Sequence, residues 1–256
     1  MGLLSQQRHQ TILDYIRSKG RVRVTELARE LGVTEVTIRR DLTQLEKNGL
    51  LKKTYGGAVP GASEMNVSVR YRQTRNLAAK RIIGRLAADL IHDGDNVYLE
   101  AGSTCYEIIP YLTHKKDLTV IVNSLHLMSR LYEQVQHKII ILGGQYRQER
   151  MDMIGPGAEM AVSQLSGYTA FTGADDISIE SGISGADVAT VSFTKTVLRH
   201  ASRIIFVGDR SKFDKPALYK IADLDDLDAI VTNVYPGEAW AALCAEKGID
   251  LIYETE

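Results

Sequence analysis

Residues 31–42 read Leu-Gly-Val-Thr-Glu-Val-Thr-Ile-Arg-Arg-Asp-Leu, and this stretch decides the fold of the N-terminal part of the chain. Gly32 closes one apolar-periodic segment, in the position that the end of a helix favours. Thr34 opens the next segment as an N-cap, with Glu35 in the first turn, where a carboxylate complements the helix dipole. Two helices joined by the short turn 32–34 predict a helix-turn-helix.

The flanking residues add one helix before this motif and a hairpin after it. Residues 12–16 carry three apolar side chains on one helical face, and Gly20 closes that helix. Residues 21–24 alternate Arg and Val, which predicts a very short strand, and Thr25 is expected to cap the helix that follows. Residues 50–57 read as a strand, two lysines and a tight turn, which is typical of a wing.

The third helix is expected to contact nucleic acid. Ile38, Leu42 and Leu45 form its inner stripe, so the side chains between them face outward. One arginine among short side chains suits a major groove, where Arg pairs with guanine and methyl groups touch thymine. The residues predicted to contact DNA, with the caps and the wing included, are Thr25, Thr34, Val36, Thr37, Arg39, Arg40, Gln44, Lys47, Lys52 and Lys53. The alternative is a charged helix face that is simply solvated.

The charge distribution divides the chain in two. The first 60 residues hold 11 Lys and Arg against 6 Asp and Glu, and the remaining residues hold 20 against 26. The total is therefore nearly neutral, while the N-terminal part is basic and the rest is acidic. A basic domain on an acidic body indicates that the basic part meets a polyanion such as DNA.

These motifs together resemble one family. The run from Val33-Thr34 through Thr37-Ile38-Arg39-Arg40-Asp41-Leu42, continued by Leu45-Glu46-Lys47-Asn48-Gly49, closely resembles the DeoR-type bacterial transcription regulators. Arg8-His9-Gln10 before it and Tyr55-Gly56-Gly57-Ala58 after it resemble the same family. The resemblance implies a winged helix-turn-helix that binds double-stranded operator DNA.

The remainder of the chain is predicted to be an α/β domain. We expect the DNA-binding domain at residues 1–58, a linker rich in Pro, Gly and Ser at 59–75, and an effector-sensing and oligomerisation domain at 76–256. Apolar runs such as 118–122 and 204–207 are nearly continuous and rich in β-branched residues. Such runs indicate strands that are covered on both faces, hence a mainly parallel sheet with helices between the strands.

Small and polar residues follow several of these predicted strands. In open α/β sheets, ligands bind beyond the carboxyl ends of the strands, and a Gly-Ser-Thr turn there can hold an anion. Each such loop alone is weak evidence, because the same residues are normal in turns and caps. The residues predicted to bind an effector are Gly102, Ser103, Thr104, Cys105, Asn123, Ser124, Gly143, Gly144, Asp175, Asp176 and Lys212.

The body also resembles the DeoR family, through Ala101-Gly102-Ser103-Thr104, Leu142-Gly143-Gly144 and Ser211-Lys212-Phe213 among others. This resemblance implies a fold like ribose-5-phosphate isomerase and CoA-transferase, and an effector that is a phosphorylated sugar or a related metabolite, with Lys212 as a phosphate partner. The chain departs from the family pattern at Glu100, where Asp is usual, and at Asp176, where Gly is usual. A helix lysine is also replaced near Phe193. Asp176 could accept bonds from sugar hydroxyls, or could repel phosphate.

Two classes of function follow from the sequence. The first is an effector-controlled DNA-binding regulator, expected to repress a carbohydrate-metabolism operon as a homodimer or homotetramer. The alternative is a sugar-phosphate isomerase-like enzyme with an accessory DNA-binding domain, whose general base would come from acidic residues such as Glu100 or Asp209. We expect no cofactor and no metal, since Cys and His lack ligand spacing. We expect no membrane segment, and hence a cytoplasmic protein.

Overall fold

The computed structural model describes residues 5–60, 69–134 and 136–255. It divides into two compact units, Met1–Arg72 and Gln73–Glu256. Within the predicted linker 59–75, Val59 and Pro60 belong to a strand, and Val69–Thr74 form the helix α4. The composition of this segment therefore did not predict the end of this strand or the helix α4. Residues 61–68, which hold the rest of the predicted linker, lie outside the described residues.

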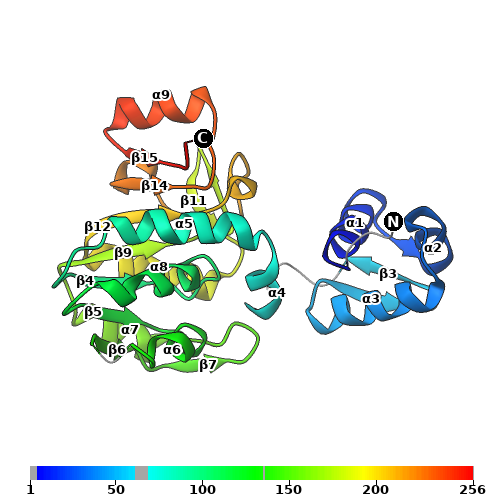
Figure 1. The fold of residues 1–256 in the computed structure, drawn as a ribbon, viewed down its shortest axis with the longest axis horizontal. Helices are drawn as coiled ribbons and strands as arrows, with labels where there is room; N and C mark the ends of the chain where they lie inside the picture. The colour runs from blue at the N-terminus through cyan, green and yellow to red at the C-terminus, as the bar shows by residue number, and fades with distance from the viewer. Residues whose placement is uncertain (1–4, 61–68, 135, 256) are drawn as a thin grey trace. The chain divides into compact units, whose positions relative to one another are not determined.

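The first unit contains three helices packed on a small sheet. Its elements are α1 Ser5–Lys19, β1 Val22–Arg23, α2 Val24–Leu31, α3 Glu35–Lys47, β2 Leu51–Thr54 and β3 Gly57–Pro60. The sheet has the order β1-β3-β2, with antiparallel pairing throughout. Figure 1 shows α1, α2 and α3 gathered around β3. The inner stripe of α3, formed by Ile38, Leu42 and Leu45, is buried in the common core, which confirms the predicted inner face.

The helix ends of this unit confirm one predicted cap and correct another. Thr34 has extended backbone angles, and its hydroxyl accepts a hydrogen bond from the Thr37 amide at 3.2 Å, as predicted. The prediction for Thr25 is wrong, because α2 begins at Val24 and Thr25 lies inside its first turn. The amide of Val24 instead donates to the Gly56 carbonyl at 2.9 Å. The wing thus supplies the backbone acceptor that a side-chain cap would otherwise provide.

One buried carboxylate ties α1 to α3. Asp41 is 6% exposed, and its carboxylate accepts from Nε and a terminal nitrogen of Arg8 at 2.5 and 3.0 Å. His9 Nε2 lies 3.0 Å from the same carboxylate. The hydrogen bond to Asp41 raises the pKa of Arg8. This paired charge fixes the angle at which α3 presents its outer face, because two-point Arg–carboxylate pairing is geometrically specific.

The second unit is built on a seven-stranded sheet of order β15-β14-β12-β9-β4-β5-β6. Every neighbouring pair in it is parallel, which confirms the predicted sheet type. Its strands are β4 Asn96–Leu99, β5 Thr119–Val122, β6 Lys138–Ile141, β9 Tyr168–Thr172, β12 Ala201–Val207, β14 Ala229–Val231 and β15 Asp250–Ile252.

Shorter elements surround this sheet. The remaining strands are β7 Gln145–Arg147, β8 Asp152–Ile154, β10 Asp176–Ser178, β11 Gly182–Gly185 and β13 Tyr219–Ala222. The helices after α4 are α5 Leu77–Asp89, α6 Leu125–Leu131, α7 Pro156–Ser163, α8 Val188–His200 and α9 Glu238–Lys247. The short 3-10 helices are η2 Cys105–Glu107, η3 Ile109–His114, η4 Arg210–Lys212 and η5 Leu224–Asp226.

Each face of the sheet has its own core, because successive strand residues point to opposite faces. Val97 and Leu99 of β4 pack with α5, η2, η3 and α6, whereas Tyr98 packs with α7, α8 and α9. The helices therefore form one layer on each side of the sheet. This double coverage explains the apolar runs that marked the strands in the sequence.

The strand order places a switch point between β4 and β9. From β4 the chain adds β5 and then β6 on one side, then returns to place β9 on the other side of β4 and continues outward to β15. Loops that leave two adjacent strands in opposite directions open a crevice beyond their carboxyl ends, and ligands of open α/β sheets bind there.

A substitution at Gly84, in the middle of α5, tests how closely this helix packs on the η2 segment. A Cβ atom at Gly84 would lie 2.2 Å from the Glu107 carbonyl oxygen. We expect Gly84→Ala to lower the free energy of unfolding by about 1–3 kcal/mol through overpacking, although alanine favours helix over glycine by about 1 kcal/mol. Chemical denaturation of the full chain measures this change in the free energy of unfolding. The control is Gly143→Ala, whose Cβ would meet nothing within 4 Å and should leave stability unchanged. Equal stability of Gly84→Ala and wild type would contradict this packing.

Candidate DNA-binding surface and effector site

The outer face of α3 forms a shallow, open groove. Its lining consists of Val36, Arg39, Arg40, Thr43, Gln44 and Lys47. All of these except Thr43 are among the residues that the sequence predicted to contact DNA. Val36 is 60% exposed, so its apolar side chain is accessible in this groove. An exposed apolar side chain among cations fits the methyl groups and acceptor atoms of a major groove.

Some of the predicted contact residues already have partners. Arg39 donates to Glu35 at 3.2 Å, one helical turn away, and the hydroxyls of Thr34 and Thr37 lie 3.0 Å apart. Within residues 5–60, no hydrogen bond or ion pair is found for the side chains of Arg40 or Gln44, and both residues are exposed. These two side chains are therefore available to reach base edges.

The wing is attached to α3 by its second lysine. Lys53 donates from its backbone amide to Glu46 Oε1 at 2.7 Å and from Nζ to Thr43 Oγ1 at 2.9 Å. Lys52 is exposed on the same strand, β2. The two lysines therefore differ: Lys53 sets the position of the wing against α3, and Lys52 leaves its charge available for a phosphate.

Arg40 and Lys52 give a paired test of this surface. We expect Arg40→Ala to cost about 1–3 kcal/mol on a selected duplex and to relax base preference within one half-site. Lys52→Ala should weaken all sequences alike and reduce the salt dependence of binding, since it removes one phosphate contact. Fluorescence anisotropy at several salt concentrations, on selected and scrambled duplexes, separates the two effects. Equal affinity of Arg40→Ala and wild type for the selected duplex would rule out the assignment of Arg40.

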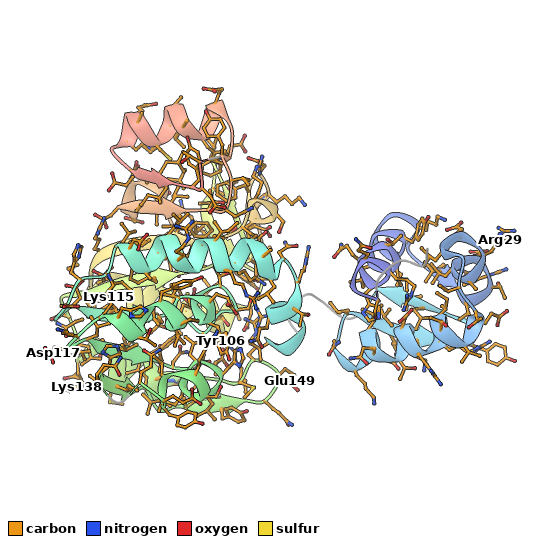
Figure 2. All side chains as sticks on the ribbon, viewed as in Figure 1. Arg29, Tyr106, Lys115, Asp117, Lys138 and Glu149 are labelled. Atoms are coloured by element: carbon orange, nitrogen blue, oxygen red, sulfur yellow. The ribbon has the colours of Figure 1, made fainter. Side chains whose placement is uncertain are left out.

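In the second unit, the predicted effector residues lie at one edge of the sheet. They belong to loops that follow β12, β9, β4, β5 and β6, which are five consecutive strands of the sheet. In Figure 2, Tyr106 and Glu149 mark the side where these strands end, and Lys115, Asp117 and Lys138 mark the side where β5 and β6 begin. Parallel pairing thus brings together residues that are far apart in the sequence.

Glu100 joins the two loops at the switch point. Its Oε2 accepts from the Gly173 amide at 2.6 Å and from Thr172 Oγ1 at 2.9 Å, and its Oε1 accepts from Thr194 Oγ1 at 2.7 Å. Burial raises the pKa of Glu100, and these three hydrogen bonds oppose the rise without cancelling it. Glu100 therefore bonds the segment after β4 to the end of β9 and keeps a carboxyl group at the switch point.

This contact lies near Phe193, where the resemblance implied that a helix lysine is replaced. Phe193 is 2% exposed in the core, and it is the neighbouring Thr194 that faces the site. The Glu100 carboxylate thus reaches across to the Thr194 hydroxyl on α8.

Lys212 brings a cation to the same edge. Its Nζ donates to the Asp175 carbonyl oxygen at 3.0 Å, which joins the loop after β12 to the loop after β9. The Asp175 carboxylate accepts from the Ala186 amide at 2.8 Å. Asp176 is half-buried at the start of β10, opposite Ser184 of β11. The three predicted residues Asp175, Asp176 and Lys212 thus lie in one connected region.

Several other predicted effector residues serve the structure of the loops instead. Cys105 is fully buried, its Sγ lies 3.5 Å from the Phe171 carbonyl oxygen, and burial raises the pKa of its thiol, so the expectation that it lines a ligand is wrong. Asn123 is 2% exposed and is bound to Tyr98 and Met153.

Ser124 and the glycine pair complete this group. Ser124 is 1% exposed and caps α6 by accepting from the Leu127 amide. Gly144 lies so close to α7 that a Cβ would meet Ala158 at 2.9 Å and the Ile154 carbonyl at 2.7 Å, whereas Gly143 has open space. The glycine at 144 is therefore required for packing. Local sequence cannot distinguish a glycine that approaches a ligand from one that approaches a helix.

The Gly102-Ser103-Thr104 turn keeps its predicted place after β4. All three residues are half-buried, and the turn leads into the 3-10 helix η2. The amide of Tyr106 donates to the Gly102 carbonyl at 3.1 Å, which closes the turn. Only short 3-10 segments follow, so any anion held here would depend on the Ser and Thr hydroxyls and local amides.

Sequence reasoning missed an arginine cluster beside this edge. Arg147 pairs with Asp152 at 2.6 Å and also with Asp187, the N-cap of α8, and donates to Thr190 at 2.9 Å. Burial opposes ionisation of Asp187, but hydrogen bonds from Thr190 and Arg147 lower its pKa overall. The cluster fixes the β7–β8 hairpin to α8. Arg147 lies 40 residues from Asp187 and 43 from Thr190, so no local pattern signals the link to α8.

In the part of the chain that the structure describes, no group of three His, Cys, Asp or Glu side chains could hold a metal ion. No helix among the described residues is long and apolar enough to cross a membrane.

An exposed recognition helix with a wing, on the same chain as an α/β domain with a loop-lined edge, defines a DNA-binding transcription regulator with a sensor domain. Comparison with known families agrees. Residues 8–63 match the DeoR-like helix-turn-helix domain, and residues 75–234 match the DeoR C terminal sensor domain. The chain belongs to the DeoR family of transcriptional regulators. It is a regulator and not an enzyme, so the isomerase alternative does not hold.

Relatives support this membership along the whole chain. The chain is 31% identical to a putative aga operon transcriptional repressor of Escherichia coli O157:H7, over 89% of this chain and 86% of the relative. It is also 31% identical to the HTH-type transcriptional repressor GlcR of Bacillus subtilis (strain 168), over 98% of this chain and 96% of the relative.

Solved structures show more distant likeness. An eIF2B delta structure from Chaetomium thermophilum covers 63% of this chain and 58% of its own, with a TM-score of 0.48 and 15% identity. A D-ribose-5-phosphate isomerase in complex with phospho-erythronic acid covers 53% of each chain, with a TM-score of 0.40 and 19% identity.

Proposed function

We propose that this protein represses a carbohydrate-use operon, and that a small phosphorylated metabolite bound at the carboxyl edge of the sheet controls its hold on operator DNA in the cytoplasm. The observation that carries this proposal is the convergence of five loops from consecutive strands, with Lys212 among them. The relatives named above as repressors support the direction of control.

The chemistry of the edge favours an anion with hydroxyl groups. Lys212 supplies a positive charge, and Ser103 and Thr104 supply hydroxyl donors on the neighbouring loop. A phosphate would give Lys212 a partner with a full negative charge in place of the uncharged Asp175 carbonyl. The carboxylates of Glu100 and Asp176 accept hydrogen bonds and suit sugar hydroxyls better than a second anion.

The response would follow from linkage between two sites. If the metabolite favours one arrangement of the subunits, then the spacing of paired DNA-binding domains changes, and with it operator affinity. A homodimer or homotetramer fits this scheme, because paired half-sites mirror two-fold symmetry. Coupling of this kind is typically about 1–3 kcal/mol, which changes affinity by about 5–150-fold.

Lys212 is the residue whose removal tests the effector site. In calorimetric titrations of the full chain with a panel of sugar phosphates, at least one member should bind wild type. Lys212→Ala should then lose about 1.5–3 kcal/mol of that affinity. Lys138→Ala is the matched control, since Lys138 is exposed at the opposite edge of the sheet (Figure 2). Unchanged affinity in Lys212→Ala, or no binding by any member of the panel, would refute the site.

Asp176 distinguishes two ways of binding the sugar. Asp176→Asn keeps the size of the side chain and removes its charge. If the carboxylate accepts bonds from sugar hydroxyls, the variant should bind the same sugar phosphate several-fold more weakly, because hydrogen bonds to charged groups are the stronger ones. If the carboxylate faces the phosphate, removal of the repulsion should tighten binding. We expect the weaker binding, and tighter binding in the same titrations would reverse the assignment.

A further inference from the structure

An unusual bend precedes the first long helix of the sensor domain. Asn76 separates α4 from α5 and has left-handed backbone angles, φ 52° and ψ 37°, which are uncommon for a residue other than glycine. It occupies the N-cap position of α5, yet its side chain makes no capping hydrogen bond. An asparagine in that position ordinarily satisfies the free amides of the helix, so its side chain has been diverted to another partner.

That partner is the loop that carries Lys212. The Asn76 amide nitrogen donates to Asp209 Oδ1 at 3.0 Å and lies 3.3 Å from Ser211 Oγ as a second acceptor. Asp209 is 4% exposed, and the same oxygen accepts from the Ser211 amide and hydroxyl at 3.0 and 2.5 Å. We call the group Asn76, Asp209 and Ser211 the Asn76 clasp. It joins residues that are 133 positions apart in the sequence.

The loop 209–212 and the bend at Asn76 each have a further hydrogen bond besides the Asn76 clasp. Lys212, next to Ser211, donates to the Asp175 carbonyl at 3.0 Å, so the loop 209–212 is fixed between the β9 loop and Asn76. Lys80, one turn into α5 and 5% exposed, donates to the Arg75 carbonyl at 2.6 Å. The bend is therefore stiff, and displacement of the loop reaches it directly through the clasp.

We propose that Asn76 is the coupling residue through which the loop 209–212 acts on α4, the helix that leads along the chain to the DNA-binding domain. This inference rests on the proposed function, in which a phosphate engages Lys212. A ligand that takes Lys212 from Asp175 shifts the adjoining Ser211 and Asp209, and the clasp transfers the shift to Asn76. The direction of α4 changes with it, because Asn76 is the residue at which α4 and α5 meet.

Hydrogen exchange on the full chain tests the clasp without any ligand. Asn76→Asp keeps the size of the side chain and its tolerance of the left-handed backbone, but it places a carboxylate against Asp209. Loss of one hydrogen-bonded contact should speed exchange of the amides in residues 69–80 by roughly three- to tenfold. Asn96→Asp is the matched control, since Asn96 is exposed at the amino end of β4, and it should leave these amides unchanged.

The coupling itself is measured with a second substitution. Lys212→Ala should speed exchange in residues 69–80 of an otherwise wild-type chain and add nothing in the Asn76→Asp background. If Asn76→Asp does not fold, Asn76→Gly removes the amide and keeps the backbone conformation, with the same expected result. Unchanged exchange in residues 69–80, or an effect of Lys212→Ala that persists without the Asn76 amide, would overturn the proposal.

A binding experiment then separates this inference from the proposed function. With the sugar phosphate that wild type binds in the panel, Asn76→Asp should keep its ligand affinity within about twofold, since Asn76 does not touch Lys212. The ligand should change its affinity for the selected duplex at most one third as much as in wild type. If no sugar phosphate binds, the proposed function fails and the exchange data still decide the clasp. If the ligand changes DNA affinity equally in both proteins, the clasp carries no signal.

Discussion

Parallel pairing of the seven strands is the constraint on which the sensor domain depends. Strands that run in one direction end at one edge, so every polar loop after a strand is delivered to the same place. The same pairing requires a crossover between strands, and these crossovers supply the helices that cover both faces. The apolar strands, the two cores and the loop-lined edge are therefore consequences of one arrangement. Glu100 completes it by bonding the two loops at the switch point.

In the DNA-binding domain a single buried carboxylate has the comparable role. The domain is small, and the inner stripe of α3 packs in its core. Asp41 lies on α3 between the inner stripe and the outer face, and its two-point pairing with Arg8 fixes the angle of this helix. Burial of a charge is costly unless it is paired, so such pairs are retained where geometry matters more than stability. The outer face is then free to carry Arg40 and Gln44 toward DNA.

The two domains can act as one regulator only if binding of a ligand at the carboxyl ends of the strands changes the structure of the chain that leads to the DNA-binding domain. Buried acidic groups at the carboxyl ends of the strands are suited to transmit such a change, because each one bonds segments that are remote in sequence. Glu100 joins the β4 and β9 loops, and Asp209 joins the β12 loop to the start of α5. A ligand that competes for any of these bonds changes contacts on both sides of it.

The sequence by itself determined the features that arise within a few residues. The stops at Gly20 and Gly32, the cap at Thr34 and the inner stripe of α3 follow from backbone preference and helical spacing, and the structure bears them out. The apolar runs likewise predicted a parallel sheet and its polar edge. Tertiary structure alone decided the rest: that Gly56 replaces Thr25 as the cap of α2, that Cys105 and Asn123 face inward, and that Asn76 meets Asp209. These outcomes depend on which strands become neighbours, and strand order is set by packing of the whole domain rather than by any local pattern.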